Sequence, residues 1–155
     1  MADQILVVTA SILDQSMLEK EHQYGPGPLP VVKDLVDLGI NLVVLPKIDE
    51  YYALYKKEQP EDTWVDYDKY VKRTLVPLVN SVMARVKTGS TFLGVLSYQG
   101  DKNQAVEPET SKVMIELFRL FDRNCMLTPY FEIKENLTEE EMELIISDIA
   151  MSLGI

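Results

Sequence analysis

Ile5-Leu6-Val7-Val8-Thr9 is the stretch that decides the fold. Its aliphatic and β-branched residues run without polar alternation, which is typical of a strand buried on both faces of a parallel sheet. Ile40-Asn41-Leu42-Val43-Val44-Leu45 has the same character, and we expect a second buried strand there that stops at Pro46. Residues 91–96 and 126–133 complete a predicted set of four strands.

Segments with helical spacing separate these strands. Residues 31–38 carry an apolar stripe that ends before Gly39, a residue suited to a left-handed helix cap. Residues 65–87 carry a longer stripe with Pro77 inside it, where we expect a kink. The polar segment 47–57 between them is interpreted as a short helix or an ordered loop.

Two further helices are predicted in the carboxyl-terminal part of the chain. Pro108 suits the first turn of a helix that precedes the fourth strand. Thr138 and Glu141 form a capping box at the start of the last helix, whose apolar stripe reaches Leu153. Residues 10–30 contain a Gly-Pro-Gly-Pro stretch, so we expect a long functional loop with at most one helical turn.

Strands and helices therefore alternate four times along residues 1–155, which we interpret as one domain. Right-handed crossovers predict an α/β fold of three layers, with a four-stranded parallel sheet in the order 2-1-3-4, as in flavodoxin- or Rossmann-like proteins. Ligands bind such sheets outside the carboxyl ends of the strands, where the strand order reverses. The crevice between the first and third strands, faced by loops 10–30, 46–58 and 97–107, is the predicted functional face.

The composition is that of an acidic globular protein. The 155 residues include 25 Asp and Glu against 15 Lys and Arg, and the formal net charge is −10. Such a surface repels phosphate backbones, so we expect no nucleic-acid partner. We see neither a signal peptide nor an apolar run of ~20 residues, and we therefore expect a cytoplasmic protein that does not enter a membrane.

Several kinds of chemistry lack the residues that they need. Ala10 and Ser11 follow the first strand without a glycine, which excludes the common nucleotide-phosphate loops. His22 is the only histidine, and we interpret it as a loop residue, so we expect no metal. Cys125 is the only cysteine, expected to be buried at the start of the fourth strand. Neither Ser11 nor Ser97 lies in a nucleophile elbow, which disfavours a Ser–His mechanism.

Two groups of residues beyond the second strand have open interpretations. Asp49 and Glu50 are candidate acid–base residues, although carboxylates also stabilise the start of a helix by complementing its dipole. Tyr51 and Tyr52 belong to a tyrosine-rich segment around Trp64. These rings would suit a ring-shaped ligand, a protein interface or the packing of the domain's own core.

Four short segments also follow, in order, the layout of a known family. They are Val8-Thr9-Ala10-Ser11-Ile12-Leu13, Gly25-Pro26-Gly27-Pro28-Leu29, Leu45-Pro46-Lys47-Ile48-Asp49, and Gly94-Val95-Leu96 with the loop at 100–106. In this layout the chain resembles the small iron–sulfur proteins related to thiouracil desulfurase. In that family three cysteines in these segments hold a four-iron, four-sulfur cluster with one open iron, and a carboxylate and a serine assist removal of sulfur.

The three cluster positions hold other residues in this chain. Ala10, Lys47 and Gln104 stand where the resemblance places the cysteines, and none of them can replace a thiolate as an iron ligand. Asp49 takes the place of the carboxylate and Asn103 that of the serine. The resemblance thus implies the fold, and the substitutions predict a protein without cluster or other cofactor.

The resulting hypothesis is a cluster-free accessory or binding protein, comparable to a pseudoenzyme, of the kind found in anaerobes. We expect Ser11, Lys47, Asn103 and Gln104 to bind a small ligand in the crevice. We also expect a protein partner or a homodimer, with Tyr51, Tyr52 and Trp64 at the interface. The alternative is a metal-independent enzyme that acts on a small nucleoside-like or other ring compound, with Asp49 or Glu50 as acid–base.

Overall fold

The computed structural model describes residues 3–106, 111–136 and 138–152, and its strands form one parallel sheet. The strands are β1 (Gln4–Thr9), β2 (Ile40–Leu45), β3 (Thr91–Tyr98) and β4 (Tyr130–Ile133). Their order across the sheet is β2-β1-β3-β4, which confirms the predicted order 2-1-3-4 and the α/β class. The carboxyl ends of all four strands therefore lie at one edge of the sheet.

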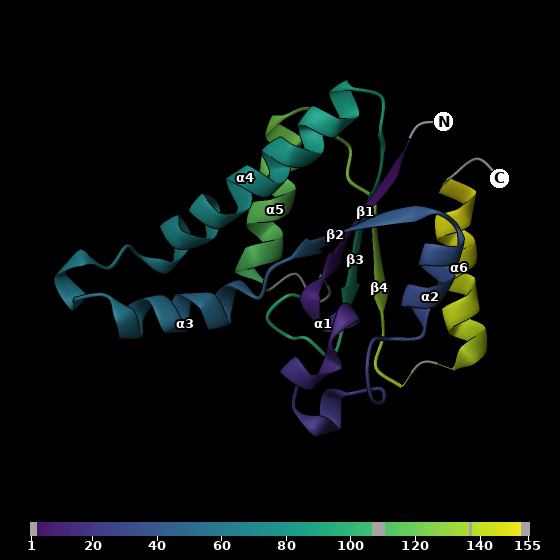
Figure 1. Ribbon diagram of the computed structural model, residues 1–155, viewed down its shortest axis with the longest axis horizontal. Coiled ribbons are helices and arrows are strands. Elements are labelled where there is room, and N and C mark those ends of the chain that lie inside the picture. Colours follow the sequence, from purple (N-terminus) through teal and green to yellow (C-terminus); the bar gives the residue numbers. More distant parts are fainter. Residues whose placement is uncertain (1–2, 107–110, 137, 153–155) are drawn as a thin grey trace.

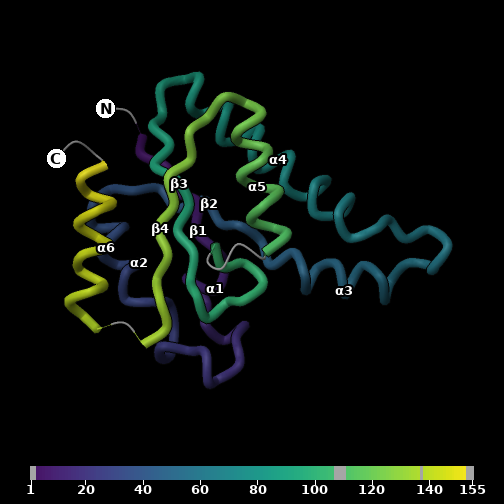
Figure 2. The backbone as a smooth tube through the Cα atoms, turned by 180° about the vertical axis from the view of Figure 1, so that it is seen from behind, coloured from purple at the N-terminus to yellow at the C-terminus, as the bar shows by residue number. Residues whose placement is uncertain are grey.

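Helices cover both faces of this sheet (Figures 1 and 2). The helices α2 (Val31–Asp37) and α6 (Glu139–Ser152) lie on one face, and α4 (Tyr67–Lys87) and α5 (Lys112–Arg123) lie on the other. Two apolar clusters fill the space between the layers, one on each face. Among the described residues, no helix has both the length and the apolar character needed to cross a membrane.

The segment after β1 is more structured than the sequence indicated. It contains the short helix α1 (Ala10–Leu13) and two 3-10 turns, η1 (Gln15–Met17) and η2 (Lys20–His22). The side chain of Gln15 binds this segment together, because its amide donates to the carbonyl of Gly27 at 2.9 Å and its oxygen accepts from the backbone of Tyr24 at 2.6 Å. The buried side chain of Gln15 thus supplies hydrogen bonds to backbone groups of this segment that lie outside regular helices and strands.

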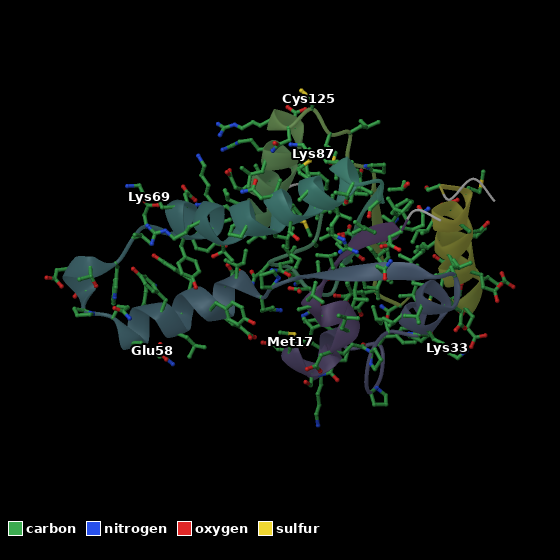
Figure 3. The ribbon with its side chains drawn as sticks, turned by 45° about the horizontal axis from the view of Figure 1, so that its top comes forward. Met17, Lys33, Glu58, Lys69, Lys87 and Cys125 are labelled. Atoms are coloured by element: carbon green, nitrogen blue, oxygen red, sulfur yellow. The ribbon has the colours of Figure 1, made fainter. Side chains whose placement is uncertain are left out.

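A helical arm projects from the body of the molecule. It consists of residues 48–70, which comprise α3 (Ile48–Glu58), the 3-10 turn η3 (Glu61–Thr63) and the first turn of α4. Both backbone views show the arm extending away from the sheet (Figures 1 and 2). In the side-chain view, Glu58 of α3 and Lys69 of α4 mark its outer part (Figure 3). The arm begins at the carboxyl end of β2, so its base lies at the predicted functional edge.

Three expectations for the strands need correction. The second strand is not fully buried, because β2 is an edge strand and the side chain of Val44 is 42% exposed. The fourth strand begins at Tyr130 rather than at residue 126, directly after Pro129, which has no N–H to donate to a neighbouring strand. Cys125 is exposed rather than buried, since it occupies the left-handed turn that ends α5, with φ 57° (Figure 3).

The capping box of the last helix is confirmed in a modified form. The backbone N–H of Glu141 donates to Oγ1 of Thr138 at 3.2 Å, and that hydroxyl donates to the Glu141 carboxylate at 3.1 Å. The Glu141 carboxylate therefore accepts a hydrogen bond from the side chain of Thr138. Pro77 lies inside α4 as expected. The expectations for Pro108 and Leu153 lie outside the described residues.

Candidate functional site

A buried ion pair joins the two loops that follow β2 and β3. The Lys47 ammonium donates to Oδ1 of Asp101 at 3.1 Å, and the two side chains are only 7% and 1% exposed. Beside this pair, the Gln104 amide donates to the carbonyl of Pro46 at 2.6 Å. Lys47 and Gln104, both predicted from the sequence, are thus brought together, but they bind the protein's own groups.

Two oxygen atoms of this buried group have no hydrogen-bond partner within the described part of the chain. They are Oδ2 of Asp101 and Oε1 of Gln104. Buried polar atoms are normally hydrogen-bonded, and each exception costs stability. The Lys47 ammonium is the compensating charge for the Asp101 carboxylate, so the stability of this edge depends on that pair.

The two candidate serines lie at the ends of their strands but have other partners than His22. Ser11 is fully buried, and its hydroxyl lies 3.3 Å from that of Thr9. Ser97 donates to Oε1 of Glu132 at 2.9 Å. The imidazole of His22 instead contacts Glu135, with Nδ1 at 2.9 Å from Oε1. These contacts agree with the sequence argument against a Ser–His mechanism.

An open pocket of about 600 Å³ lies between the arm and the loop after β3, and we call it the arm pocket. Pockets that hold small molecules have volumes of about 300–1,000 Å³. Asp49 of α3 and Asn103 of the loop after β3, two residues predicted from the sequence, line it. Its complete lining is Asp49, Tyr52, Ala53, Lys56, Tyr67, Lys102, Asn103, Ser111 and Lys112.

Tyr52, predicted for an interface, also lines this pocket, but the remaining predicted site residues do not. Lys47 and Gln104 are close in the sequence to the lining residues Asp49 and Asn103, but their side chains are buried. Ser11 is buried in α1. Glu50 is exposed in the first turn of α3, where it complements the helix dipole. Of the two candidate acid–base residues, only Asp49 therefore faces the arm pocket.

Asp49 is held by a tyrosine from the other side of the arm. The phenol of Tyr67 donates a short hydrogen bond to Oδ1 of Asp49. Burial, together with this bond and the negative charge of Asp49, raises the pKa of Tyr67. The phenol therefore stays protonated at neutral pH and acts as a permanent donor. The carboxylate is thus placed in the pocket wall by a neighbour that the sequence pattern did not reveal.

The tyrosines of the arm pack mainly against one another. The ring of Tyr52 lies 5.4 Å from that of Tyr67 and 5.0 Å from that of Tyr70, and Tyr55 lies 5.2 Å from Tyr70. The Tyr52 hydroxyl also donates to the carbonyl of Val65 at 3.0 Å. This cluster holds α3 against α4, so core packing of the arm accounts for Tyr52.

Tyr51 and Trp64 have a different environment from Tyr52. Their side chains are 49% and 38% exposed, and the described ring–ring contacts do not include them. The indole N–H of Trp64 donates to the carbonyl of Gln59 at 2.8 Å, which fixes the ring at the outer end of the arm. Of the three predicted interface residues, these two present most apolar surface to solvent.

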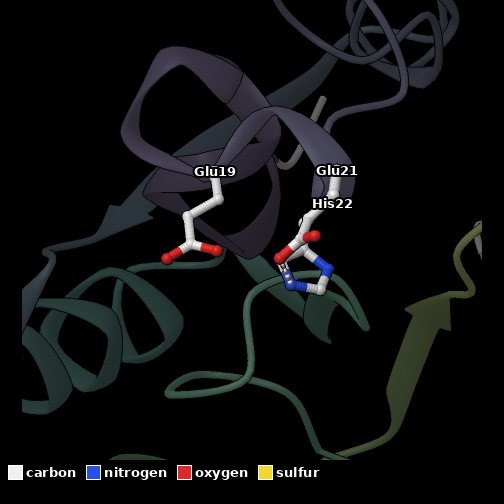
Figure 4. Close-up of side chains that lie close together, drawn as sticks. All are labelled: Glu19, Glu21 and His22. Carbon is white, nitrogen blue, oxygen red and sulfur yellow. Dashed lines mark ion pairs between the residues drawn. The ribbon is translucent and has the colours of Figure 1, made fainter.

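Glu19, Glu21 and His22 form the group of described residues whose ligand atoms lie close enough to hold a metal ion (Figure 4). These atoms lie within 4.8 Å of one another, and Nε2 of His22 is 3.5 Å from Oε1 of Glu21. Both carboxylates are exposed. We predicted His22 to be a loop residue. Its contact with Glu135 could not be predicted, because the two residues are far apart in the sequence.

A second, more apolar pocket of about 420 Å³ lies between α5 and β4. Apolar side chains such as Met114, Phe118 and Tyr130 line it. No sequence pattern indicated it, because it depends on how the start of β4 packs beside α5.

Comparison of the chain with models of protein families, with curated proteins and with solved structures gives no match.

Proposed function

We propose that this chain is a binding protein without an iron–sulfur cluster, and that it holds a small ligand in the arm pocket. The observation that carries the proposal is the pocket itself, at the carboxyl edge of the sheet. Polar groups converge there from three separate segments: Asp49 and Lys56 of α3, Tyr67 of α4, and Lys102 with Asn103 after β3. Pockets of this kind in parallel sheets are the usual places of ligand binding.

The residues at the three cluster positions support the proposal that this protein holds no cluster. Lys47 and Gln104 are buried and bind Asp101 and Pro46, so their side chains fill space and satisfy local polar groups. Ala10 offers no donor atom. In a relative of the thiouracil desulfurase-like proteins, this exchange would remove the desulfurising chemistry and leave a ligand-binding or accessory role in the cytoplasm.

A substitution that fills the arm pocket tests the proposal. Ala53 is exposed on α3 and lines the pocket, so Ala53→Trp places a large ring there without disturbing the core. In a thermal-shift screen of small ring compounds, anionic and neutral, we expect at least one to stabilise the wild type. A ligand at ten times its Kd stabilises a protein by about 1.4 kcal/mol, which is about 3–5 °C in Tm here. Ala53→Trp should abolish this shift.

The control for this screen is Ala84→Trp. Ala84 is also an exposed alanine on a helix, but it lies in the carboxyl-terminal part of α4 and does not line the arm pocket. It should respond to the same compounds as the wild type. The proposal would be wrong if no compound stabilised the wild type, or if Ala53→Trp responded as strongly as Ala84→Trp.

A second candidate function is catalysis by Asp49. The observation in its favour is the Tyr67–Asp49 hydrogen bond inside a ligand-sized pocket. A carboxylate held in this way can accept a proton from a small ring compound, with Tyr67 supporting its charge. Turnover of a compound found in the screen, lost in Asp49→Asn with binding retained, would favour the enzyme over the binding protein.

The exposed rings of the arm support binding to a partner protein or to a second copy of the chain. Tyr51 and Trp64 lie on the projecting arm and remain accessible, and amphipathic rings are enriched at interfaces. A homodimer or a heterologous complex through this surface is compatible with ligand binding at the base of the arm.

A further inference from the structure

The described side chains that line the arm pocket carry a net charge opposite in sign to that of the whole chain. The protein carries a formal net charge of −10, yet three lysines and only one carboxylate line this pocket. The lysines come from separate places: Lys56 from α3, Lys102 from the loop after β3, and Lys112 from the start of α5. Three ammonium groups that converge on one concave surface create a local positive potential in an otherwise acidic protein.

Two of these ammonium groups form no ion pair with the carboxylates of the described residues, and the third forms one weak pair. Within the described residues, neither Lys56 nor Lys102 forms an ion pair, and Lys112 has a single one, with Asp68 at 3.7 Å. That pair is exposed to solvent on both sides and therefore weak. Among the described residues, the lining of the pocket thus carries more positive than negative charge.

Two of these lysines lie over tyrosine rings. The ammonium of Lys56 lies 5.0 Å from the centre of the Tyr52 ring, and that of Lys112 lies 5.8 Å from the centre of the Tyr67 ring. A cation over an aromatic face is attracted by the electrons of the ring and is less free to move. Lys56 also lies 5.7 Å from the centre of the Trp64 ring. Such contacts at exposed sites contribute only about 0.5–1 kcal/mol, so they restrict the two ammonium groups weakly.

The start of α5 adds to the same field. Ser111 is the N-cap of this helix, and its side chain accepts from the backbone of Met114. Ser111 and Lys112 both line the pocket. The N-terminus of a helix carries partial positive charge, which favours anions near its first turn. The start of α5 and the three lysines thus favour the same sign of ligand.

We propose that the ligand of the arm pocket carries a phosphate-type dianion, which Lys56, Lys102 and Lys112 bind together. Lysine binds phosphate as a point charge. Three lysines therefore attract a phosphate dianion more strongly than they attract a carboxylate ligand, which carries one charge. The volume of about 600 Å³ leaves room for an organic group next to the anion. This inference rests on the proposed function and names the chemical class of its ligand.

A matched set of probes tests the charge. Phenyl phosphate, benzoate, phenol and inorganic phosphate are titrated into the full chain by calorimetry. We expect phenyl phosphate to bind most tightly, benzoate about tenfold more weakly, and phenol not measurably. Stronger binding of phenyl phosphate than of inorganic phosphate identifies an organic phosphate as the ligand, and equal binding identifies the free anion. Raising the salt concentration should weaken the binding of each anion, since salt screens exposed charges.

Substitutions of the lysines test the site. Lys102→Met should weaken phenyl phosphate binding by about tenfold, and the double variant Lys56→Met/Lys102→Met by about a hundredfold. Lys102→Arg, which keeps the charge, should retain binding. Lys87→Met is the matched control, because it removes an equal charge from an exposed helical lysine outside the pocket (Figure 3).

The outcomes separate this inference from the function on which it rests. If phenol bound as well as phenyl phosphate, with Ala53→Trp blocking both, the pocket would bind ligands but the dianion would be wrong. The dianion would also be overturned if Lys102→Met and Lys87→Met behaved alike. If Ala53→Trp weakened the binding of none of the probes and none of the screened compounds, the proposed function itself would fail.

Discussion

Lys47→Met will lower the free energy of unfolding by about 3–5 kcal/mol, because it leaves the Asp101 carboxylate buried without its compensating charge. Oδ2 of Asp101 already has no partner among the described residues, so the carboxylate cannot recover by forming another bond there. Total stabilities of domains are only about 5–15 kcal/mol, so the effect should be large in urea denaturation.

A second substitution separates the lost charge from lost packing. The double variant Lys47→Met/Asp101→Leu removes both charges and should recover most of the lost stability, since replacing a buried pair by apolar groups is often neutral. Lys33→Met is the control, because it breaks the exposed pair of Lys33 with Asp37 and should cost at most about 1 kcal/mol. If Lys47→Met were as mild as Lys33→Met, the pair would not hold this edge together.

Gly94→Ala should destabilise the sheet by about 2–6 kcal/mol. Gly94 has φ +127°, a conformation that side chains rarely adopt, and a Cβ there would lie 2.1 Å from the carbonyl oxygen of Pro129. That oxygen accepts the backbone hydrogen bond of Val95 at 3.0 Å, at the start of the pairing between β3 and β4. The estimate combines about 1–3 kcal/mol of backbone strain with about 1–3 kcal/mol of overpacking.

Gly25→Ala is the matched control for this change. A Cβ at Gly25 meets nothing within 4 Å and needs no unusual φ. Alanine there should leave stability unchanged or raise it by about 0.4–1 kcal/mol, because it restricts the unfolded chain. Equal midpoints for both variants in chemical denaturation would show that β4 does not pack against Gly94 as described.

The sheet was predictable because its signals are local. The bounds of β2 follow from an apolar run between Gly39 and Pro46, and the structure places this strand at Ile40–Leu45. The alternation of strands and helices then leaves few topologies, and the predicted order is the one observed. The errors arise where the tertiary environment decides. Leu127 looks like part of a strand, yet it lies 89% exposed in the turn region before Pro129.

The edge of the sheet at which the arm pocket lies could be predicted from the sequence, but most of the residues that line the pocket could not. The rule for parallel sheets located the edge, and Asp49 and Asn103 do line a pocket there. Asp101 escaped notice because its partner Lys47 is 54 residues away in the sequence and no local pattern joins them. Exposed residues such as Lys102 and Lys112 carry no periodic signal, so their convergence depends entirely on how the loop after β3 meets the arm.

A map of backbone amide shifts by NMR shows most directly whether the ligand binds in the arm pocket. The wild type would be saturated with the tightest-binding compound from the screen, and the perturbed amides assigned. We expect the largest shifts in residues 49–56 of α3, at Lys102 and Asn103, and at Lys112. Largest shifts around Met114, Phe118 and Tyr130, in the pocket between α5 and β4, would contradict it.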